Sequence, residues 1–146
     1  MIGGLGAMHK DYGTKSWQSL CDPAACLAGG GFFVTHAYRS FAQQASEKIQ
    51  RNETSNEIFL DKSSSPDIGT KIKQSKLCQT LTQLGDEGPD GFYRGKLANK
   101  IVKDARVAGL LLSNSDFAEF HPEVQGSIAI KYRDFEIFQT PPNSTG

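Results

Sequence analysis

Apolar side chains recur every three to four residues over most of the chain, which is the spacing of one face of a helix. The first run covers residues 2–12, and Gly13 follows it as a suitable C-terminal cap. The second run starts after a possible N-cap, Ser16, and stops at the glycine triplet 29–31. Because Pro23 interrupts this run, we expect it to break or kink the second helix. The predicted buried side of that helix consists of Trp17, Leu20, Ala24, Leu27 and Ala28.

Three further segments follow the glycine triplet. Residues 35–49 begin with a threonine cap and carry apolar residues at helical spacing, which predicts a third helix. Residues 52–70 contain few apolar side chains and many turn formers, so we predict a surface loop. Ser75 is the predicted N-cap of the next helix, and we expect Gly85 and Gly88 to close that helix.

The stretch GPDGFYRGKLANKIVKDARVAGLLLSNSDFAEF, residues 88–120, has clear start and stop signals but no reactive constellation. Its apolar residues from Phe92 to Ala105 keep helical spacing, and Gly109 stands where a left-handed C-terminal residue is expected. Ser113 and Asp116 form an acidic variant of the capping box, which predicts another helix start. The pattern indicates packing rather than catalysis.

The period of the apolar residues changes to two near the C-terminus. Two strands with a turn at Arg133-Asp134 are predicted, and Pro141 and Pro142 end the second strand. The alternating positions are Ile128, Ile130 and Tyr132, then Phe135, Ile137 and Gln139. The expected fold class is therefore α+β, mainly helical with a C-terminal β-hairpin. We expect residues 1–146 to form one domain or a partial domain, with a helical part at 1–120 and the hairpin at 127–140.

Composition and charge narrow the class of protein. The 146 residues are 38% apolar and 22% charged, which is ordinary for a globular domain. Sixteen basic and sixteen acidic residues give a net charge of zero, so nucleic acids and anionic membranes are not expected partners. No apolar run reaches the length of a membrane span, and the N-terminus lacks the features of a signal peptide.

The cysteines and the glycine triplet offer little chemistry. Cys21, Cys26 and Cys78 form neither a CxxC pair nor a set with zinc-ligand spacing, so we expect buried, small apolar residues. The triplet 29–31 lacks both the preceding strand and the following Lys-Ser/Thr of a phosphate-binding loop.

The remaining polar residues show no catalytic arrangement either. His9, His36 and His121 each lack a carboxylate or second histidine at relay or ligand spacing, so we expect solvent-facing or hydrogen-bonding roles. Three carboxylates cluster near the start of the next predicted helix; these are Asp86, Glu87 and Asp90. The helix macrodipole favours negative charge there, so the cluster does not require a bound ligand. No calcium-binding loop and no Gly-x-Ser-x-Gly elbow occur.

Three stretches together resemble the gamma-glutamyltransferase (gamma-glutamyltranspeptidase) family. Residues 88–120 are similar to its large-subunit pattern of Gly-Pro, Phe-Tyr-x-Gly, Ala-x-x-Ile-Val, Gly-Gly and a Thr-x-x-Asp-Leu helix start. MHKDYGTKSWQSLCDPAACLAGGGFFVT resembles an upstream segment with Tyr-Gly, Trp, Pro-Ala, Leu-Ala and Gly-Phe-x-Val. KYRDFEIFQTPPNSTG is similar to the family's Tyr-Arg-Gly strand pair and its Pro-Pro-Pro-Ser-Ser-Gly. Order and spacing hold across nearly the whole chain.

Four positions depart from the family pattern. Ala108 replaces the first glycine of the Gly-Gly pair, and Asp134 replaces the turn glycine. Asn143 interrupts the proline triplet, whereas Ser113 for threonine keeps a side chain that can cap a helix. The departures weaken inferences about the hairpin turn and the C-terminal loop, but not about the helix start.

The resemblance implies an N-terminal-nucleophile hydrolase of αββα fold, made as a proenzyme that cleaves itself into a large and a small subunit. A threonine freed at the new N-terminus attacks a gamma-glutamyl amide such as glutathione, with its own α-amino group as general base. Water or an acceptor amine then takes the glutamyl group, and an arginine holds the substrate's α-carboxylate. The implied partners are the rest of the large subunit, the small subunit and the small-molecule substrate; no cofactor is implied.

No catalytic, substrate-binding or metal-binding residue transfers to this chain. The family's nucleophile segment is expected downstream of Gly146 and its arginine segment upstream of Met1. Thr35-His36 lies within the segment that matches Gly-Phe-x-Val, so it does not align with the processing site. Arg39, Arg94 and Arg133 match no substrate-binding motif. We therefore expect a structural part of the large subunit; the alternative is a truncated, inactive relative that acts as a binding or interaction module.

The two hypotheses differ in the surface they predict. A piece of a larger core should expose an apolar face, most of all at the C-terminal hairpin, whereas an independent module should cover its hairpin edge. Asn52 and Asn143 begin glycosylation triplets, but such triplets often arise by chance. The resemblance implies a periplasmic, secreted or surface-attached protein. It also leaves open whether glutathione, β-lactam side-chain amides or poly-gamma-glutamate is the substrate.

Overall fold

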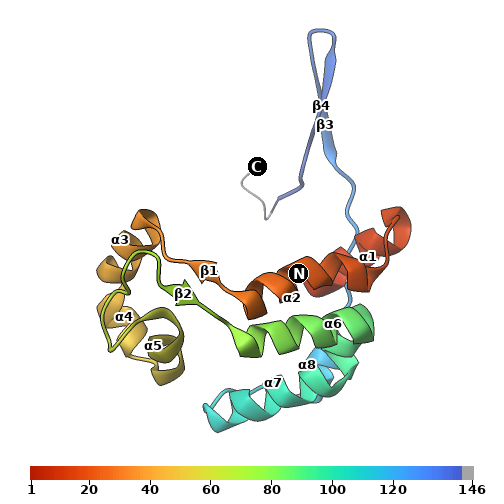
Figure 1. Cartoon of the computed structure of the whole chain (residues 1–146). Coiled ribbons are helices and arrows are strands. Elements are labelled where there is room, and N and C mark those ends of the chain that lie inside the picture. Colours follow the sequence, from red (N-terminus) through yellow and green to blue (C-terminus); the bar gives the residue numbers. More distant parts are fainter. Residues whose placement is uncertain (143–146) are drawn as a thin grey trace.

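Two helices lie along one another at the centre of the computed structural model, which describes residues 1–142. They are α2 (Trp17–Gly30) and α6 (Ser75–Arg94), and Figure 1 shows them as neighbouring layers. Small side chains permit the approach, because a Cβ added to Gly85 would lie 3.3 Å from the Cβ of Cys21. The indole Nε1 of Trp17 donates a 3.0 Å hydrogen bond to the carbonyl of Leu84.

A glycine-containing face brings α1 (Ile2–Tyr12) close to the second half of α6. A Cβ added to Gly6 would lie 2.7 Å from Cγ of Pro89, so no larger residue fits without movement. The backbone N–H of Gly3 donates a 3.0 Å hydrogen bond to the hydroxyl of Tyr93. The N-terminal helix is thus positioned by small residues rather than by a large apolar contact.

The chain turns twice between α6 and α8. Gly88 has φ 71° and breaks α6 into two segments, the second of which starts at Pro89. After α7 (Lys96–Val107), the short helix α8 (Asn114–Ala118) returns to α6. The rings of Tyr93 and Phe120 stack there with centroids 5.1 Å apart. This aromatic contact joins the chain after α8 to the second half of α6.

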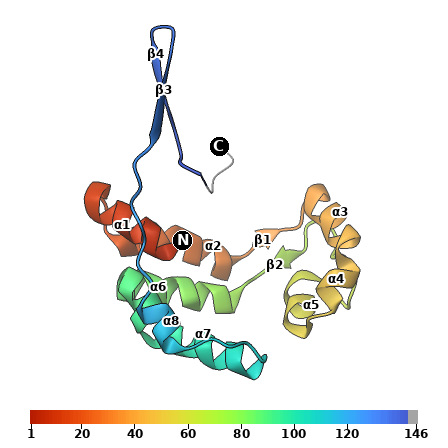
Figure 2. The same ribbon diagram turned by 180° about the vertical axis from the view of Figure 1, so that it is seen from behind.

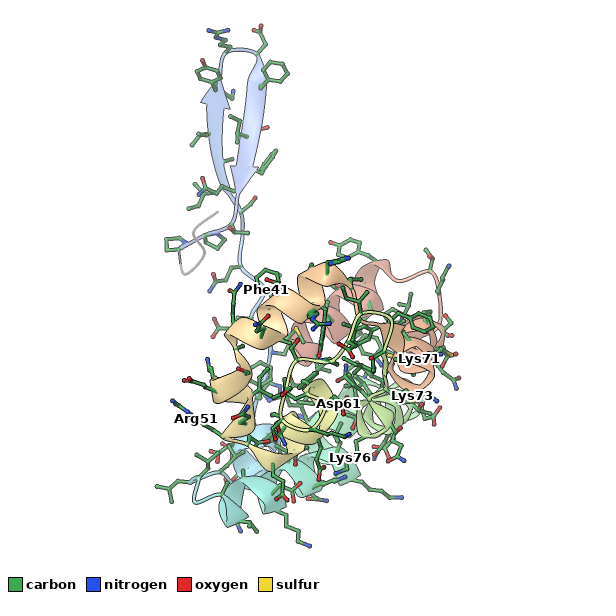
Figure 3. The ribbon with its side chains drawn as sticks, turned by 60° about the vertical axis from the view of Figure 1, so that its left-hand side comes forward. Phe41, Arg51, Asp61, Lys71, Lys73 and Lys76 are labelled. Atoms are coloured by element: carbon green, nitrogen blue, oxygen red, sulfur yellow. The ribbon has the colours of Figure 1, made fainter. Side chains whose placement is uncertain are left out.

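A separate lobe is inserted between α2 and α6, and Figures 1 and 2 show it at one end of the molecule. Its helices are α3 (His36–Gln44), α4 (Ser46–Gln50) and α5 (Glu53–Phe59). The chain enters through β1 (Phe32–Phe33) and leaves through β2 (Lys71–Ile72), which are paired antiparallel. Val34, directly after β1, is 2% exposed and exchanges backbone hydrogen bonds with Gly69 and Thr70. Phe41 and Arg51 lie on the outside of the lobe (Figure 3).

The C-terminal hairpin projects away from the helices (Figures 1 and 2). Its strands are β3 (Ile128–Tyr132) and β4 (Phe135–Gln139), in antiparallel register with Tyr132 opposite Phe135. Every residue of both strands is exposed. The mainly helical α+β class and the turn at Arg133-Asp134 are therefore confirmed.

Most predicted helix ends are confirmed by side-chain contacts. The hydroxyls of Ser16 and Thr35 accept hydrogen bonds from backbone N–H groups three residues later. Ser113 and Asp116 form a complete capping box. Gly13 caps α1, and Gly109 has the expected left-handed backbone, with φ 81°.

Several predictions within the helices are wrong. The break that was one of the two expected effects of Pro23 does not occur, since α2 continues to Gly30. The run 35–49 is two helices, because Ala45 leaves helical geometry with φ −95° and ψ 2°. Ser75 is the first residue of α6 rather than its cap. Gly85 lies inside α6, where its missing side chain lets α2 approach, so only Gly88 interrupts the helix.

The predicted loop 52–70 is also partly wrong. Its first part is α5, whose N-cap Asn52 accepts a hydrogen bond from the N–H of Ser55 at 2.9 Å. Leu60, directly after the helix, is buried. Residues 60–70 remain irregular, with one isolated bridge between Asp61 and Ser64.

The core is small for a chain of this length. Among residues 1–142 the buried apolar residues are Ala25, Ala28, Val34, Ala42, Leu60, Ile72, Leu84, Leu97, Ala98 and Val102. The accessible surface is 11116 Å². A compact monomer of 15.9 kDa is expected to expose about 7,400 Å². The chain thus exposes roughly 3,700 Å² more than such a monomer.

Within residues 1–142, none of the helices combines the length and apolar character needed to cross a membrane.

Candidate functional site

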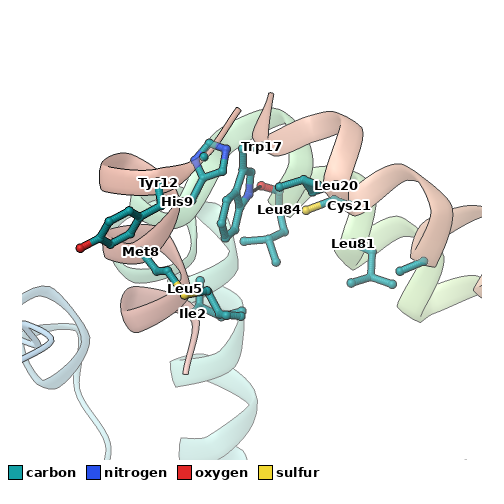
Figure 4. Close-up of a pocket in the computed structure, with 12 residues that line it drawn as sticks. Ile2, Leu5, Met8, His9, Tyr12, Trp17, Leu20, Cys21, Leu81 and Leu84 are labelled. Carbon is teal, nitrogen blue, oxygen red and sulfur yellow. Dashed lines mark hydrogen bonds between the residues drawn. The ribbon is translucent and has the colours of Figure 1, made fainter. Parts of the chain in front are cut away.

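A concave apolar groove of about 540 Å³ lies between α1, α2 and α6 (Figure 4). Its size falls within the range of small-molecule pockets. Nearly all of the lining is apolar; the residues are Ile2, Leu5, Met8, His9, Tyr12, Gly13, Trp17, Leu20, Cys21, Ala24, Leu81 and Leu84. We call this surface the α1–α2–α6 groove.

The side-chain nitrogens Nε2 of His9 and Nε1 of Trp17 are engaged in contacts of the fold. Nε2 of His9 lies 2.7 Å from the carbonyl oxygen of Lys15, and the His9 ring contacts Trp17 edge-on with centroids 5.4 Å apart. Trp17 directs its N–H to the carbonyl of Leu84. No carboxylate lines the groove. The groove can bury an apolar group, but it lacks the paired acid and base needed for proton transfer.

Cys21 is the one potential nucleophile in the groove. Burial, and to a lesser extent the carboxylate of Asp22, raise the pKa of its thiol above the ordinary value. A raised pKa lowers the thiolate fraction at neutral pH, and the thiolate is the reactive form. Cys21 is therefore suited to packing rather than to nucleophilic attack.

The prediction that the cysteines are buried is wrong for Cys26 and only partly met by the other two. All three are free thiols; Cys26 is exposed, and Cys21 and Cys78 are half-buried. Cys26 follows the buried Ala25, and one helical step of 100° carries it to the outer side of α2. Cys78 lies against Gly29, where an added Cβ would be 2.9 Å from its Sγ.

The other candidate residues are dispersed and have structural partners. His36 is the first residue of α3, and His121 is exposed after α8. Thr35 caps α3. Among the arginines, Arg39 pairs with Asp67 at 2.7 Å, and Arg133 lies 5.2 Å from the ring centroid of Tyr132.

The acidic group near the break in α6 likewise forms local contacts. Asp86 accepts a hydrogen bond from Gln18, and Glu87 accepts one from Gln83. Asp90 pairs with Arg94 at 3.0 Å. In the part of the chain that the structure describes, no three His, Cys, Asp or Glu residues lie close enough to hold a metal ion.

The sequence pattern identified the apolar faces but not their exposure. Leu20 and Leu27 were expected on the buried side of α2, yet they are 52% and 62% exposed. Helical periodicity shows that a face is apolar, but it does not show which element covers it. Asn52, from the first glycosylation triplet, is the N-cap of α5, and Asn143 lies outside the described residues.

The whole chain is similar to known proteins. A family model described as gamma-glutamyltranspeptidase matches residues 1–146. The glutathione hydrolase proenzyme of Pseudomonas sp. (strain A14) is 27% identical over 146 residues, which cover 99% of this chain and 25% of that protein. The chain thus spans about a quarter of the length of the curated relatives it matches.

Solved structures also match nearly all of this chain, which covers less than half of each matched chain. The structure of Helicobacter pylori gamma-glutamyltranspeptidase superposes with a TM-score of 0.89 and 30% identity, covering 99% of this chain and 42% of that chain. The structure of a cephalosporin acylase from Bacillus halodurans superposes with a TM-score of 0.86 and 25% identity. The match covers 97% of this chain and 28% of the acylase chain.

Proposed function

The chain belongs to the gamma-glutamyltranspeptidase family, and from this we propose that it is a structural part of the large subunit of a proenzyme acting on gamma-glutamyl amides such as glutathione. The observation that carries the proposal is the match over residues 1–146 to a family model and to about a quarter of each curated relative. In this proposal the complete protein transfers the glutamyl group to water or to an acceptor amine.

The local chemistry supports a scaffold role for these residues. The arginines and acidic residues considered above are engaged in caps, ion pairs and contacts between elements. The nucleophilic threonine, its α-amino base and the arginine for the substrate carboxylate are supplied by other parts of the precursor. Residues 1–120 and 127–140 then belong to one partial domain, whose partners are the rest of the large subunit and the small subunit.

The exposed surface favours this proposal over an independent binding module. A module that functions alone was expected to cover its hairpin, but all ten strand residues are exposed. The excess of roughly 3,700 Å² of accessible surface points in the same direction, since globular monomers of this mass bury more.

Acylase activity is the second candidate, because the similarity extends to a cephalosporin acylase with a TM-score of 0.86. The two activities are separated by measuring hydrolysis of a gamma-glutamyl amide and of a β-lactam side-chain amide by the full-length protein. Faster turnover of the β-lactam side-chain amide would replace the glutathione-type substrate in this proposal.

The first experiment is to read the natural coding sequence on both sides of the chain. An in-frame arginine segment upstream and a Thr-Thr-His segment downstream support the proposal. A frame without either segment favours the inactive module instead.

We predict that the isolated 146-residue chain does not hydrolyse gamma-glutamyl-p-nitroanilide, because the described residues contain no activated nucleophile. The full-length protein should hydrolyse it. Release of p-nitroaniline is followed by absorbance, with a buried-core variant, Val102→Asp, as control for a contaminating enzyme. Turnover that co-purifies with the isolated chain and disappears in the Val102→Asp variant would contradict the prediction.

A further inference from the structure

Another groove, polar rather than apolar, lies along α7 where the chain turns back towards α8 (Figure 1). Its volume is about 370 Å³, at the small end of the range for small-molecule pockets. The residues that line it are Asn99, Val102, Lys103, Arg106, Val107 and Asn114. We call this surface the α7 groove. Among residues 1–142, two cationic and two carboxamide side chains line it, and no carboxylate does.

The sequence of α7 places three of the polar residues on one face of the helix. Asn99, Lys103 and Arg106 are separated by four and three residues, which is the spacing of neighbours on a helix surface. The connector after α7 brings Asn114, the first residue of α8, to the same groove. Four side chains that can donate hydrogen bonds thus meet in one concavity from two helices.

Arg106 is oriented by the fold and keeps free donors. Its Nε donates a 3.0 Å hydrogen bond to the carbonyl of Leu112. In the part of the chain that the structure describes, its two terminal nitrogens form no hydrogen bond or ion pair. A guanidinium presents parallel N–H groups that match two oxygens of a carboxylate or phosphate. Because Arg106 is already oriented, less conformational entropy is lost when an anion binds.

The positive charge of the groove is not neutralised by its surroundings. Lys103 is exposed and forms no ion pair within residues 1–142. Asp116 lines an adjoining hollow together with Arg106, but its carboxylate accepts hydrogen bonds from Ser113. Asp104 follows Lys103, and one helical step of 100° directs it to another side of α7. The groove is therefore electrostatically suited to an anion.

We propose that the α7 groove binds a small organic anion, whose carboxylate or phosphate contacts Arg106 and Lys103. The side-chain amides of Asn99 and Asn114 donate further hydrogen bonds to it. Because two valines also line the groove, an anion with an aliphatic part fits better than an inorganic ion. The proposal goes beyond the proposed function, since binding at this groove requires no turnover.

Isothermal titration calorimetry of the natural full-length protein tests the proposal, with glycerol 3-phosphate and succinate as the probes. We expect a dissociation constant of about 1 mM or lower for at least one of them. Tighter binding of glycerol 3-phosphate identifies a phosphate-bearing ligand, and tighter binding of succinate identifies a carboxylate. Added salt should weaken binding, because it screens the charges. If neither probe binds at concentrations up to about 10 mM, the proposal is wrong.

Two lysines three residues apart on α7 provide a matched pair of variants. Lys103 lines the groove, whereas Lys100 is exposed outside it. Lys103→Gln should weaken binding at least about threefold, and Lys100→Gln, which removes the same charge, less than about 1.5-fold. Equal losses would show a general charge effect and overturn the proposal. Unchanged affinity in Lys103→Gln would place the anion at another site and overturn it too.

A third variant tests the role of the guanidinium. Arg106→Lys keeps the charge but removes the planar fork, so it should weaken binding about tenfold. Circular dichroism checks that the helices are retained in this variant. If it fails to fold, the comparison of Lys103→Gln with Lys100→Gln still decides. Folded Arg106→Lys protein that binds the probes as tightly as the natural protein would contradict the contact with Arg106.

The same titrations separate this inference from the proposed function. Full-length protein that turns over gamma-glutamyl-p-nitroanilide but binds neither probe would overturn the inference alone. Protein that binds a probe in a Lys103-dependent manner without any turnover would contradict the proposed function and support the α7 groove.

Discussion

Gly4 and Gly6 lie two residues apart in α1 but have different surroundings. An added Cβ at Gly4 meets no atom within 4 Å, whereas at Gly6 it would lie 2.7 Å from the rigid ring of Pro89. Alanine at either position favours the helix by about 0.5–1 kcal/mol. At Gly6 the overlap with Pro89 opposes this gain by about 1–3 kcal/mol.

We therefore predict that Gly4→Ala stabilises the chain by about 0.5–1 kcal/mol and that Gly6→Ala destabilises it by about 1 kcal/mol. Urea unfolding followed by circular dichroism measures both. Stabilisation of similar size in the two variants would mean that α1 does not approach Pro89 closely.

The capping box of α8 has a pH dependence with a defined sign. Hydrogen bonds from the Ser113 hydroxyl and backbone N–H hold the pKa of Asp116 below its usual value. A carboxylate with a lowered folded-state pKa stabilises the fold above its unfolded pKa, and this contribution is lost as pH falls through the folded-state pKa.

Ser113→Ala should therefore raise the pKa of Asp116 towards its ordinary value and destabilise α8 by about 1 kcal/mol. The carboxyl resonance of Asp116 followed by NMR through an acid titration gives the pKa, and Ser113→Thr, which keeps the cap, is the control. An unchanged titration in Ser113→Ala would rule out the box in solution.

At the level of elements, the break in α6 positions everything that follows it. Gly88 has φ 71°, and an added Cβ there meets no atom within 4 Å, so only backbone strain opposes a side chain. Gly30 also has free space around an added Cβ, but its φ is not in the left-handed region. Because neither position is crowded, the comparison of Gly88 with Gly30 isolates the effect of backbone strain.

Gly88→Ala should destabilise the chain by about 1–3 kcal/mol, because the backbone of Gly88, with φ 71° and ψ −175°, lies in a region that essentially only glycine adopts. Gly30→Ala should have little effect or stabilise slightly. Thermal unfolding compares the variants, and a loss of stability in Gly30→Ala equal to that in Gly88→Ala would contradict this explanation.

Local signals in the sequence predicted the elements whose causes are local. Ser16, Thr35 and Ser113 cap helices as expected, because the donor and acceptor lie three residues apart. The missed elements depend on distant partners. β1 forms because Phe32 pairs with Ile72, forty residues later. α5 was missed although its cap Asn52 is a local signal, because the segment has few apolar residues and the burial of Leu60 next to it is visible only in the folded chain.

The candidate site shows the same limit at the scale of the whole molecule. The three cysteines and three histidines do not occur at metal-ligand spacing in the sequence. The sequence identified Leu5, Met8 and Leu20 only as members of apolar faces. That these faces form an open groove depends on how α1, α2 and α6 pack, which periodicity does not encode.

The open groove predicts dye binding by the isolated chain. An apolar fluorescent dye such as anilinonaphthalene sulfonate should bind and gain fluorescence, because the groove and hairpin expose apolar surface. Trp17 is the single tryptophan and lines the groove, so bound dye should quench its emission by energy transfer. The full-length protein should bind less dye. Dye binding without quenching of Trp17 would place the dye elsewhere.

The chain enters and leaves the lobe of α3, α4 and α5 at one place, through the paired strands β1 and β2. Phe33 pairs with Lys71, and the N–H of Gln74 donates to the carbonyl of Ala28 at 2.8 Å. A two-residue Asn-Gly turn could therefore join β1 directly to β2. Residues 34–70 are in this sense a replaceable cassette, which evolution or engineering can shorten, enlarge or exchange while α2 and α6 keep their contact.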